Sequence, residues 1–259
     1  HHTIMADAFE RVAKGELKRL IVNMPPRNTK SEFASYLFPA WFLGKYPEKK
    51  IIQTAHTAEL AVGFGRKVRN LINQEDFQGV FPGISLSSDS KAAGRWNTNK
   101  RGDYFAIGVG GAVTGKGADV LIIDDPHSEQ EAALGAYNPD VYDKVYEWYT
   151  SGPRQRLQPG GAIIVVMTRW SVRDLTGQIM KSATQREGAD DWEIIEFPAI
   201  MPSGDPLWPE FWPLEQLESL RAELPLSKWS AQYQQDPTSE EGALITVSYT
   251  HLRAHETES

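Results

Sequence analysis

The sequence has no cysteine, no long apolar run and no excess of positive charge, and each absence limits what the chain can be. Its 259 residues include no Cys, which excludes disulfides and cysteine-ligated metal sites. No apolar run is long enough to span a bilayer and no signal peptide is visible, so we expect no membrane partner. A net charge of −7 argues against a free-standing, tight nucleic-acid binder but leaves room for contact with DNA through a local patch.

The composition that remains is that of an ordinary globular chain, with 41% hydrophobic and 24% charged residues. Five apolar stretches without polar alternation predict buried strands at residues 18–23, 50–55, 120–123, 162–167 and 192–197. Helical patterns lie before, between and after them, at residues 1–15, 32–43, 57–72, 139–157 and 173–182. This alternation predicts an α/β fold with a mainly parallel central sheet and helices on both faces.

Two further segments depart from that pattern. Residues 95–98 and 104–109 are predicted to form a hairpin around a polar turn, and residues 77–94 are predicted to be rich in turns. Within the helices we expect Phe33, Leu37 and Trp41 to share one face, and Val141, Val145, Trp148 and Tyr149 to be buried.

Residues 20–32 read as a strand, a loop and the start of a helix that opens at Lys30-Ser31. This is the layout of a phosphate-binding P-loop, or Walker A motif. The first N–H groups of a helix have no partner within it and carry partial positive charge, which favours a bound phosphate. Lys30 would add a charge for the β- and γ-phosphates, and the Ser31 hydroxyl would hold Mg²⁺.

The loop lacks the glycines of the form G-x-x-x-x-G-K-[ST], because Met24 and Thr29 stand in their places. Glycine takes positive φ angles freely, whereas a β-branched residue does not, so we expect Thr29 to avoid them. On this segment alone two readings stay open: a nucleotide site, or an ordinary helix N-terminus that happens to carry a lysine and a serine.

Polar clusters follow two other predicted strands, with Asp124-Asp125 after residues 120–123 and Thr168-Arg169 after residues 162–167. Active groups of parallel sheets gather at the carboxyl ends of the strands. Apolar residues followed by two acids form a Walker B motif, in which Asp124 would hold Mg²⁺, mostly through water. Asp125 would orient or deprotonate the attacking water. The alternative is a plain acidic turn.

Two other side chains are candidate catalytic groups. Arg27 lies within the phosphate loop, where a guanidinium can bind phosphate oxygens and stabilise charge that develops in phosphoryl transfer. Thr168 ends the strand expected beside the nucleotide strands, where a hydroxyl can sense the γ-phosphate or the water. An exposed loop arginine and a plain strand-end threonine are the alternatives.

Three segments, NMPPRNTKSE, GADVLIIDDPHS and VVMTRW-x-x-x-DLTGQI, occur in this order. Together with GVGGAVTGKG and LPLSKWSAQYQQDP, they resemble the ATPase domain of the tailed-phage terminase large subunit, a DNA-packaging motor. The glycine-poor P-loop is characteristic of many of these proteins. The resemblance implies an additional-strand, RecA-like P-loop NTPase fold that uses ATP with Mg²⁺, and a homo-oligomeric ring around double-stranded viral DNA.

The resemblance also implies roles for individual residues. Nucleotide binding falls to Pro26, Arg27, Asn28, Thr29, Lys30 and Ser31. Metal binding falls to Ser31 and Asp124, and catalysis to Arg27, Thr168 and Asp125. A cation supplied to the site of a neighbouring subunit is not identified; Arg95, Arg101 and Lys116 are candidates, and each has surface charge as its alternative.

For the domain organisation we expect an ATPase domain over residues 1–205 that is truncated at its N-terminus. A linker subdomain would follow over residues 206–245, with Trp208, Trp212 and a face of Leu214, Leu217 and Leu220. Residues 246–259 resemble translated adapter sequence, and we expect them to be non-native. The parent protein would continue into a nuclease domain that this chain lacks.

The resemblance further implies the portal protein and the small terminase subunit as partners, in the host cell cytoplasm at the procapsid portal. Two competing functions stay open. One is a helicase-like P-loop NTPase unconnected with packaging, and the other is a fold that binds nucleotide or DNA without turnover.

Overall fold

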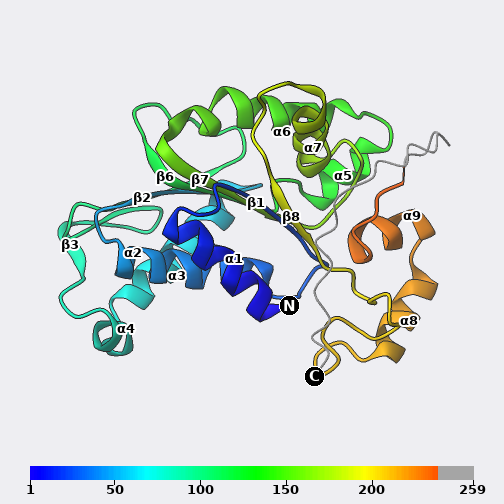
Figure 1. Cartoon of the computed structure of the whole chain (residues 1–259), viewed down its shortest axis with the longest axis horizontal. Helices are drawn as coiled ribbons and strands as arrows, with labels where there is room; N and C mark the ends of the chain where they lie inside the picture. The colour runs from blue at the N-terminus through cyan, green and yellow to red at the C-terminus, as the bar shows by residue number, and fades with distance from the viewer. Residues whose placement is uncertain (239–259) are drawn as a thin grey trace.

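The computed structural model describes residues 1–238, except for the side chains of residues 90 and 91. An eight-stranded sheet lies between two layers of helices (Figure 1), in the strand order β3-β4-β5-β2-β6-β7-β1-β8. The α/β fold predicted from the sequence is therefore confirmed. The predicted tail at residues 246–259 and the last part of the predicted linker lie outside the described residues.

Six strands form the parallel part of the sheet, and all five predicted apolar strands are among them. They are β1 (Arg19–Asn23), β2 (Lys50–Ala55), β5 (Asp103–Gly108), β6 (Ala118–Asp124), β7 (Leu157–Met167) and β8 (Glu193–Glu196). Since β7 lies between β6 and β1, the carboxyl ends of these three strands meet at one edge of the sheet.

The other end of the sheet is antiparallel and contains β3 (Leu86–Ala92) and β4 (Arg95–Thr98). The predicted hairpin of β4 and β5 is confirmed. The prediction that residues 77–94 are mainly turns was wrong, because this range contains β3 and most of α4 (Glu75–Val80). An edge strand pairs on one side only, so the polar sequence LSSDSKA carries none of the apolar pattern that marks a buried strand.

One face of the sheet is covered by α1 (His2–Lys14), the π-helix η1 (Glu32–Leu37), α2 (Phe38–Lys45) and α3 (Ala58–Ile72) (Figure 1). Gly15, at φ 79°, ends α1, and the Thr57 side chain caps α3 by accepting the Leu60 N–H. Leu37 is 42% exposed, so the predicted face with Phe33 and Trp41 is not the buried one. The wider π turn shifts the helical period, and the core takes Ala34, Phe38 and Phe42 instead.

The opposite face is covered by α5 (Glu129–Gly135), α6 (Asp140–Ser151), the 3₁₀ helix η2 (Pro153–Arg156) and α7 (Leu175–Gln185). The prediction that α6 reaches residue 157 was wrong, because Gly152 and Pro153 end the helix and Leu157 already belongs to β7. Val145 and Tyr149 are buried as predicted, whereas Val141 and Trp148 are half-buried.

The chain then forms α8 (Leu214–Glu223), α9 (Leu226–Lys228) and the π-helix η3 (Trp229–Tyr233) beside the sheet (Figure 1). A small core of Ala199, Leu217 and Trp229 holds this segment together. Of the predicted leucine face only Leu217 is buried, and Leu214 is 37% exposed. The domain boundary at residues 205 and 206 stays a prediction.

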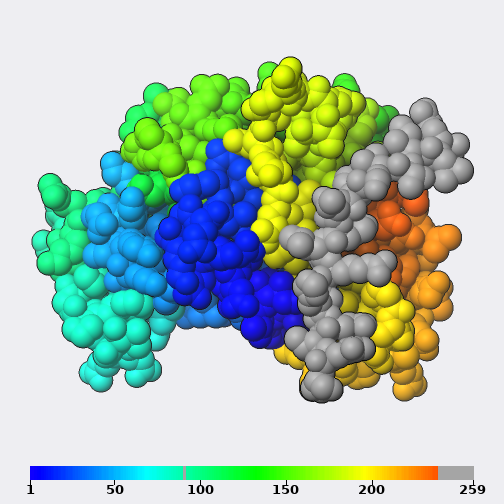
Figure 2. Space-filling view, viewed as in Figure 1, coloured from blue at the N-terminus to red at the C-terminus, as the bar shows by residue number. Residues whose placement is uncertain are grey.

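The N-terminal helix α1 lies exposed across the near face of the molecule in Figure 2, between the light-blue and the yellow segments. Its first residue contacts the predicted linker, since the His2 ring centroid lies 5.0 Å from that of Trp208. Within the described residues, no helix is long and apolar enough to cross a membrane.

Candidate functional site

The predicted P-loop and the predicted acidic pair come together where β1, β6 and β7 end. Lys30 Nζ lies 2.9 Å from Asp125 Oδ2, and Ser31 Oγ donates a hydrogen bond to Asp124 Oδ1 over 2.8 Å. These pairs join residues more than 90 positions apart in the sequence, as expected when parallel strands end at the same edge. Four of the predicted site residues therefore form one cluster.

The phosphate loop reaches its shape without glycine. Arg27 has φ 58° and Thr29 has φ 71°, so the expectation that Thr29 avoids positive φ was wrong. Local hydrogen bonds hold the loop: Asn28 Nδ2 donates to Pro26 O over 2.9 Å, and Thr29 Oγ1 donates to Asn28 O over 2.5 Å. His2 Nε2 lies 2.8 Å from Thr29 Oγ1. A left-handed threonine costs about 1–3 kcal/mol, which the surrounding contacts must offset.

Asp125 is fixed from three directions. Lys30 pairs with one of its carboxylate oxygens, and the backbone N–H of Thr168 donates to the other over 2.8 Å. Its own N–H donates to Val166 O on β7 over 2.9 Å, while its backbone lies in the left-handed region at φ 39°. The side chain keeps 28% of its surface exposed, so it is held in place yet open to solvent on one side.

Asp124 is 1% exposed and accepts a second hydroxyl, that of Ser35, over 2.6 Å. Burial, and next the charge of Asp125, raise the pKa of Asp124 to about 7, although Lys30 and the two serines oppose the rise. The positive charge of Lys30, which pairs with Asp125, thus does not offset the burial of the Asp124 carboxylate. A cation bound there would stabilise its ionised form.

The other two predicted catalytic residues differ from each other. The Thr168 hydroxyl donates to Met24 O over 3.0 Å, which ties the end of β7 to the start of the phosphate loop. Its backbone N–H, not its hydroxyl, contacts Asp125. The Arg27 side chain is exposed above the loop. The structure therefore places Thr168 inside the cluster and Arg27 at its solvent side.

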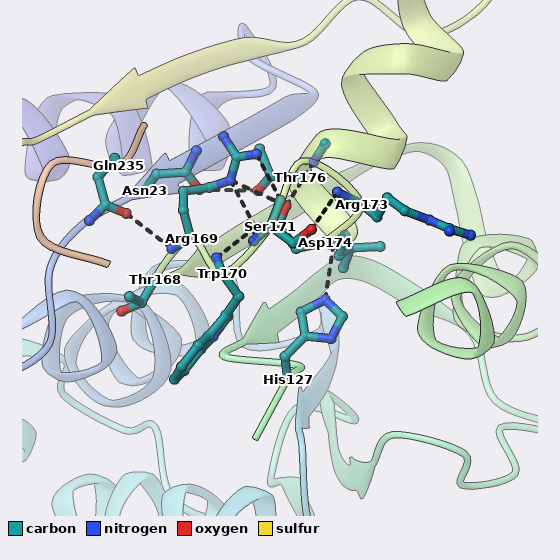
Figure 3. A network of polar contacts seen from close by, with 12 residues as sticks. Asn23, His127, Thr168, Arg169, Trp170, Ser171, Arg173, Asp174, Thr176 and Gln235 are labelled. Carbon is teal, nitrogen blue, oxygen red and sulfur yellow. Dashed lines mark hydrogen bonds and ion pairs between the residues drawn. The ribbon is translucent and has the colours of Figure 1, made fainter. Parts of the chain in front are cut away.

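A second polar network, drawn in Figure 3, lies just beyond Thr168. Asp174 is fully buried and accepts from Arg169 Nε over 3.0 Å, from the N–H of Trp170 over 2.9 Å and from that of Gly177 over 2.9 Å. Burial alone would raise the pKa of Asp174, but the Arg169 guanidinium and these hydrogen bonds hold it below its ordinary value. This network caps α7 and fixes the turn after β7.

The same network contacts the Walker B turn and the linker segment. His127 Nε2 accepts the Leu175 N–H over 2.9 Å, and Gln235 Oε1 accepts the Arg169 N–H over 3.2 Å (Figure 3). Sequence reasoning missed His127, Asp174 and Gln235 as parts of the site. Asp174 alone carries a local signal, since an aspartate directly before a helical pattern is a typical N-cap.

The three residues predicted as candidates to act on a neighbouring subunit, Arg95, Arg101 and Lys116, differ in their surroundings. Lys116 Nζ pairs with Asp103 Oδ2 over 2.8 Å and lies 5.1 Å from the Phe105 ring centroid. Arg95 and Arg101 line an open surface groove of about 600 Å³ at the antiparallel part of the sheet. Arg101 lies in the turn before β5, at the edge opposite Lys30, so it does not reach the site of its own chain.

Mg²⁺ is the metal that the sequence predicts here. Among the described residues, no group of three or more His, Cys, Asp or Glu side chains could hold a metal ion. Asp124 and Ser31 instead offer one carboxylate and one hydroxyl. This small set of oxygen ligands fits Mg²⁺, which commonly takes one or two protein oxygens and completes its shell with water and substrate phosphates.

The sequence matches no protein-family model and no curated protein sequence. Among solved structures, the large terminase ATPase domain of Thermus phage P74-26 is similar at 16% identity and a TM-score of 0.50, covering 87% of this chain and 91% of that one. A mutant of that domain gives 15% identity and a TM-score of 0.51, covering 89% and 93%. The chain therefore has the RecA-like fold of phage large terminase ATPase domains.

Proposed function

We propose that the chain is the ATP-hydrolysing motor domain of a phage terminase large subunit, which drives translocation of double-stranded viral DNA into the procapsid. The observation that carries the proposal is the convergence of Lys30 and Ser31 with Asp124 and Asp125 at one edge of the sheet. The shared fold supports it, because the same edge is where parallel α/β sheets bind their ligands.

Nucleotide binding would use the loop from Pro26 to Ser31. The backbone N–H groups at the start of η1 favour phosphate oxygens, and Lys30 supplies a buried charge for them. Lys30 is paired with Asp125, so an incoming phosphate would compete for the same ammonium group. Arg27, exposed at the loop, would bind phosphate from the solvent side.

Hydrolysis would depend mainly on Asp125. Its carboxylate is held by the Thr168 N–H and is partly exposed, so it can orient a water molecule and accept its proton. Ser31 and Asp124 would hold Mg²⁺, which when bound neutralises charge on the β- and γ-phosphates. Thr168 would serve as a positioning group, because its hydroxyl is engaged by Met24 O.

The motor role extends the proposal beyond one subunit. We propose a homo-oligomeric ring on the viral DNA, with the portal protein and the small terminase subunit as partners, in the host cytoplasm at the procapsid portal. Arg95 and Arg101, rather than the paired Lys116, are the candidates to act on a neighbouring site. A nuclease domain would belong to the parent protein.

The test is ATP binding and hydrolysis by the wild-type chain and by Lys30→Ala. Lys14→Ala is the matched control, because Lys14 is an exposed lysine of α1 that pairs with Glu10 on the same helix. We expect Lys30→Ala to lose both activities and the control to keep them. Hydrolysis should rise with protein concentration, since a neighbouring subunit would supply a cation.

Three outcomes would overturn the proposal. Unchanged hydrolysis by Lys30→Ala would remove the P-loop assignment. ATP binding without hydrolysis at any concentration, with or without duplex DNA, would favour a fold without turnover. ATP-dependent separation of a forked duplex would favour the helicase-like alternative over a packaging motor.

A further inference from the structure

Each oxygen of the Asp124 carboxylate accepts a hydrogen bond from a serine hydroxyl, but the two serines differ in how close they lie to the phosphate loop. Ser31, at the start of the helix after the loop, donates to Oδ1 over 2.8 Å. Ser35, one turn further along η1, donates to Oδ2 over 2.6 Å and is 0% exposed. Ser31 can therefore contact a bound ligand at the loop, whereas Ser35 is enclosed by protein.

A third buried group lies behind Ser35. Gln53 on β2 is 0% exposed, and its Nε2 donates to Ser35 Oγ over 2.9 Å. The strand β2 pairs directly with β6, with Gln53 opposite Ile122 two residues before Asp124. Gln53, Ser35 and Asp124 thus form a hydrogen-bonded chain that runs from the middle of the sheet to the site.

When Asp124 is ionised, as it would be with a cation bound, the hydrogen bonds have only one possible direction. An ionised carboxylate accepts but cannot donate, so the single hydroxyl proton of Ser35 must point to Asp124. The Ser35 oxygen must then accept from Gln53, which only the amide nitrogen can provide. Hydrogen bonds in such a chain polarise and strengthen one another. An amide at position 53 therefore helps to orient a carboxylate on the neighbouring strand.

Ser35 lies within the π-helix η1. The Phe38 N–H bonds to Phe33 O, five residues back, which widens the turn that holds Ser35. Such π turns are rare in proteins, and those that occur often lie at functional sites. Ser35 follows Ser31 by four positions, so both hydroxyls lie on the side of the helix that faces Asp124.

We propose that Ser35 and Gln53 are positioning residues that hold the Asp124 carboxylate in the orientation in which it and Ser31 take up Mg²⁺. This inference rests on the proposed nucleotide site and adds two residues that do not contact the ligand. Groups that orient a metal-binding side chain typically change metal affinity by about 10- to 100-fold when removed.

The experiment measures ATP affinity with Mg²⁺ and with EDTA, for the wild-type chain, Ser35→Ala and Gln53→Met. Met has a length similar to that of Gln but no N–H donor. Thr54→Val is the matched control, since Thr54 is the next residue on β2, is buried, and its hydroxyl has no partner among the described residues. ATP affinity in EDTA reports that each variant has kept a folded phosphate loop.

We expect Mg²⁺ to increase the ATP affinity of the wild-type chain and of Thr54→Val by the same factor. That factor should fall about tenfold or more in Ser35→Ala. It should fall about fivefold in Gln53→Met, the effect of one ordinary hydrogen bond. Affinity in EDTA should stay unchanged in all three variants.

A full Mg²⁺ effect in both Ser35→Ala and Gln53→Met would overturn this inference and leave the proposed function standing. An equal loss with Mg²⁺ and with EDTA would also overturn it, because the residues would then support the loop in general. A wild-type chain whose ATP affinity does not respond to Mg²⁺ would overturn the metal site itself.

Discussion

Asp124 and Asp174 are both buried carboxylates, 1% and 0% exposed, at the same edge of the sheet. Asp174 contacts a guanidinium, that of Arg169, and accepts three backbone N–H groups as well. Asp124 accepts two serine hydroxyls and has a second carboxylate, Asp125, as its neighbour in the sequence. The two carboxylates are buried to the same extent but differ in the charge of the groups that surround them.

The pKa values follow this difference in opposite directions. Burial and Asp125 raise the pKa of Asp124 to about 7, whereas Arg169 and the hydrogen bonds outweigh burial and lower that of Asp174. A buried carboxylate that is fully neutralised belongs to the scaffold. One whose pKa stays raised despite a nearby lysine is a candidate site for binding a cation.

The largest expected effect is a difference in the free energy of unfolding between variants of these two aspartates. Asp174→Asn should lower the free energy of unfolding by about 3–5 kcal/mol, because the buried Arg169 loses the charge of the carboxylate that contacts it over 3.0 Å. Asp124→Asn should change it by less than about 1 kcal/mol in metal-free buffer, since it removes a charge that the site holds poorly. Denaturant unfolding at pH 7 measures both. Equal losses in the two variants would contradict the comparison.

The next effect concerns the acidic neighbour of Asp124. Asp125→Asn should keep ATP binding and slow hydrolysis about a hundredfold or more, because the carboxylate that we propose orients the water is gone. Steady-state hydrolysis and equilibrium binding are measured on the same preparation. A large loss of binding in this variant would mean that Asp125 does not have the role assigned to it.

Arg27→Ala should have a smaller effect and one confined to activity. Loss of a charged hydrogen bond to phosphate predicts about tenfold slower hydrolysis or weaker binding. Stability should not change, since the side chain is exposed. Arg154→Ala, which instead loses the ion pair with Asp190, is the contrasting variant. If Arg27→Ala matches the wild type in both assays, the residue is surface charge.

The smallest expected effect is a pH dependence at His127. Burial lowers its pKa below the ordinary value of 6.5, and its Nε2 accepts the Leu175 N–H only when unprotonated. The unfolded chain then binds a proton more readily than the folded one, so stability falls as pH drops below about 6.5. His127→Gln keeps an acceptor without the charge.

Unfolding free energies of the wild type and His127→Gln between pH 7 and pH 5 isolate this contribution. The wild type should lose up to about 1 kcal/mol more than the variant over this range. Parallel curves would show that His127 does not change protonation on unfolding in this range.

The sequence predicted the parallel strands and the main site residues for the same reason. Apolar runs without alternation mark buried strands, and polar residues that end such runs must lie at their shared edge. Lys30, Ser31, Asp124 and Asp125 could therefore be placed from local patterns alone. Thr168 could be placed at the site as well. The sequence did not show that its N–H, rather than its hydroxyl, contacts Asp125.

What the sequence could not show depends on distant partners or on backbone conformation. Gln53 looks like an isolated polar residue in a strand, and its importance appears only with Ser35 beside it, 18 positions earlier. The left-handed backbone of Thr29 runs against the preference of its residue type and is held by contacts that include His2. The polar edge strand β3 gave no apolar signal at all.

We propose that Asp124 and Asp125 have different roles at one nucleotide site. The most direct test compares the effect of Mg²⁺ on ATP affinity in Asp124→Asn and in Asp125→Asn. We expect Asp124→Asn to lose the increase in affinity that Mg²⁺ gives, and Asp125→Asn to keep it. The reverse result, or an undiminished Mg²⁺ effect in Asp124→Asn, would contradict the assignment of the metal to Asp124.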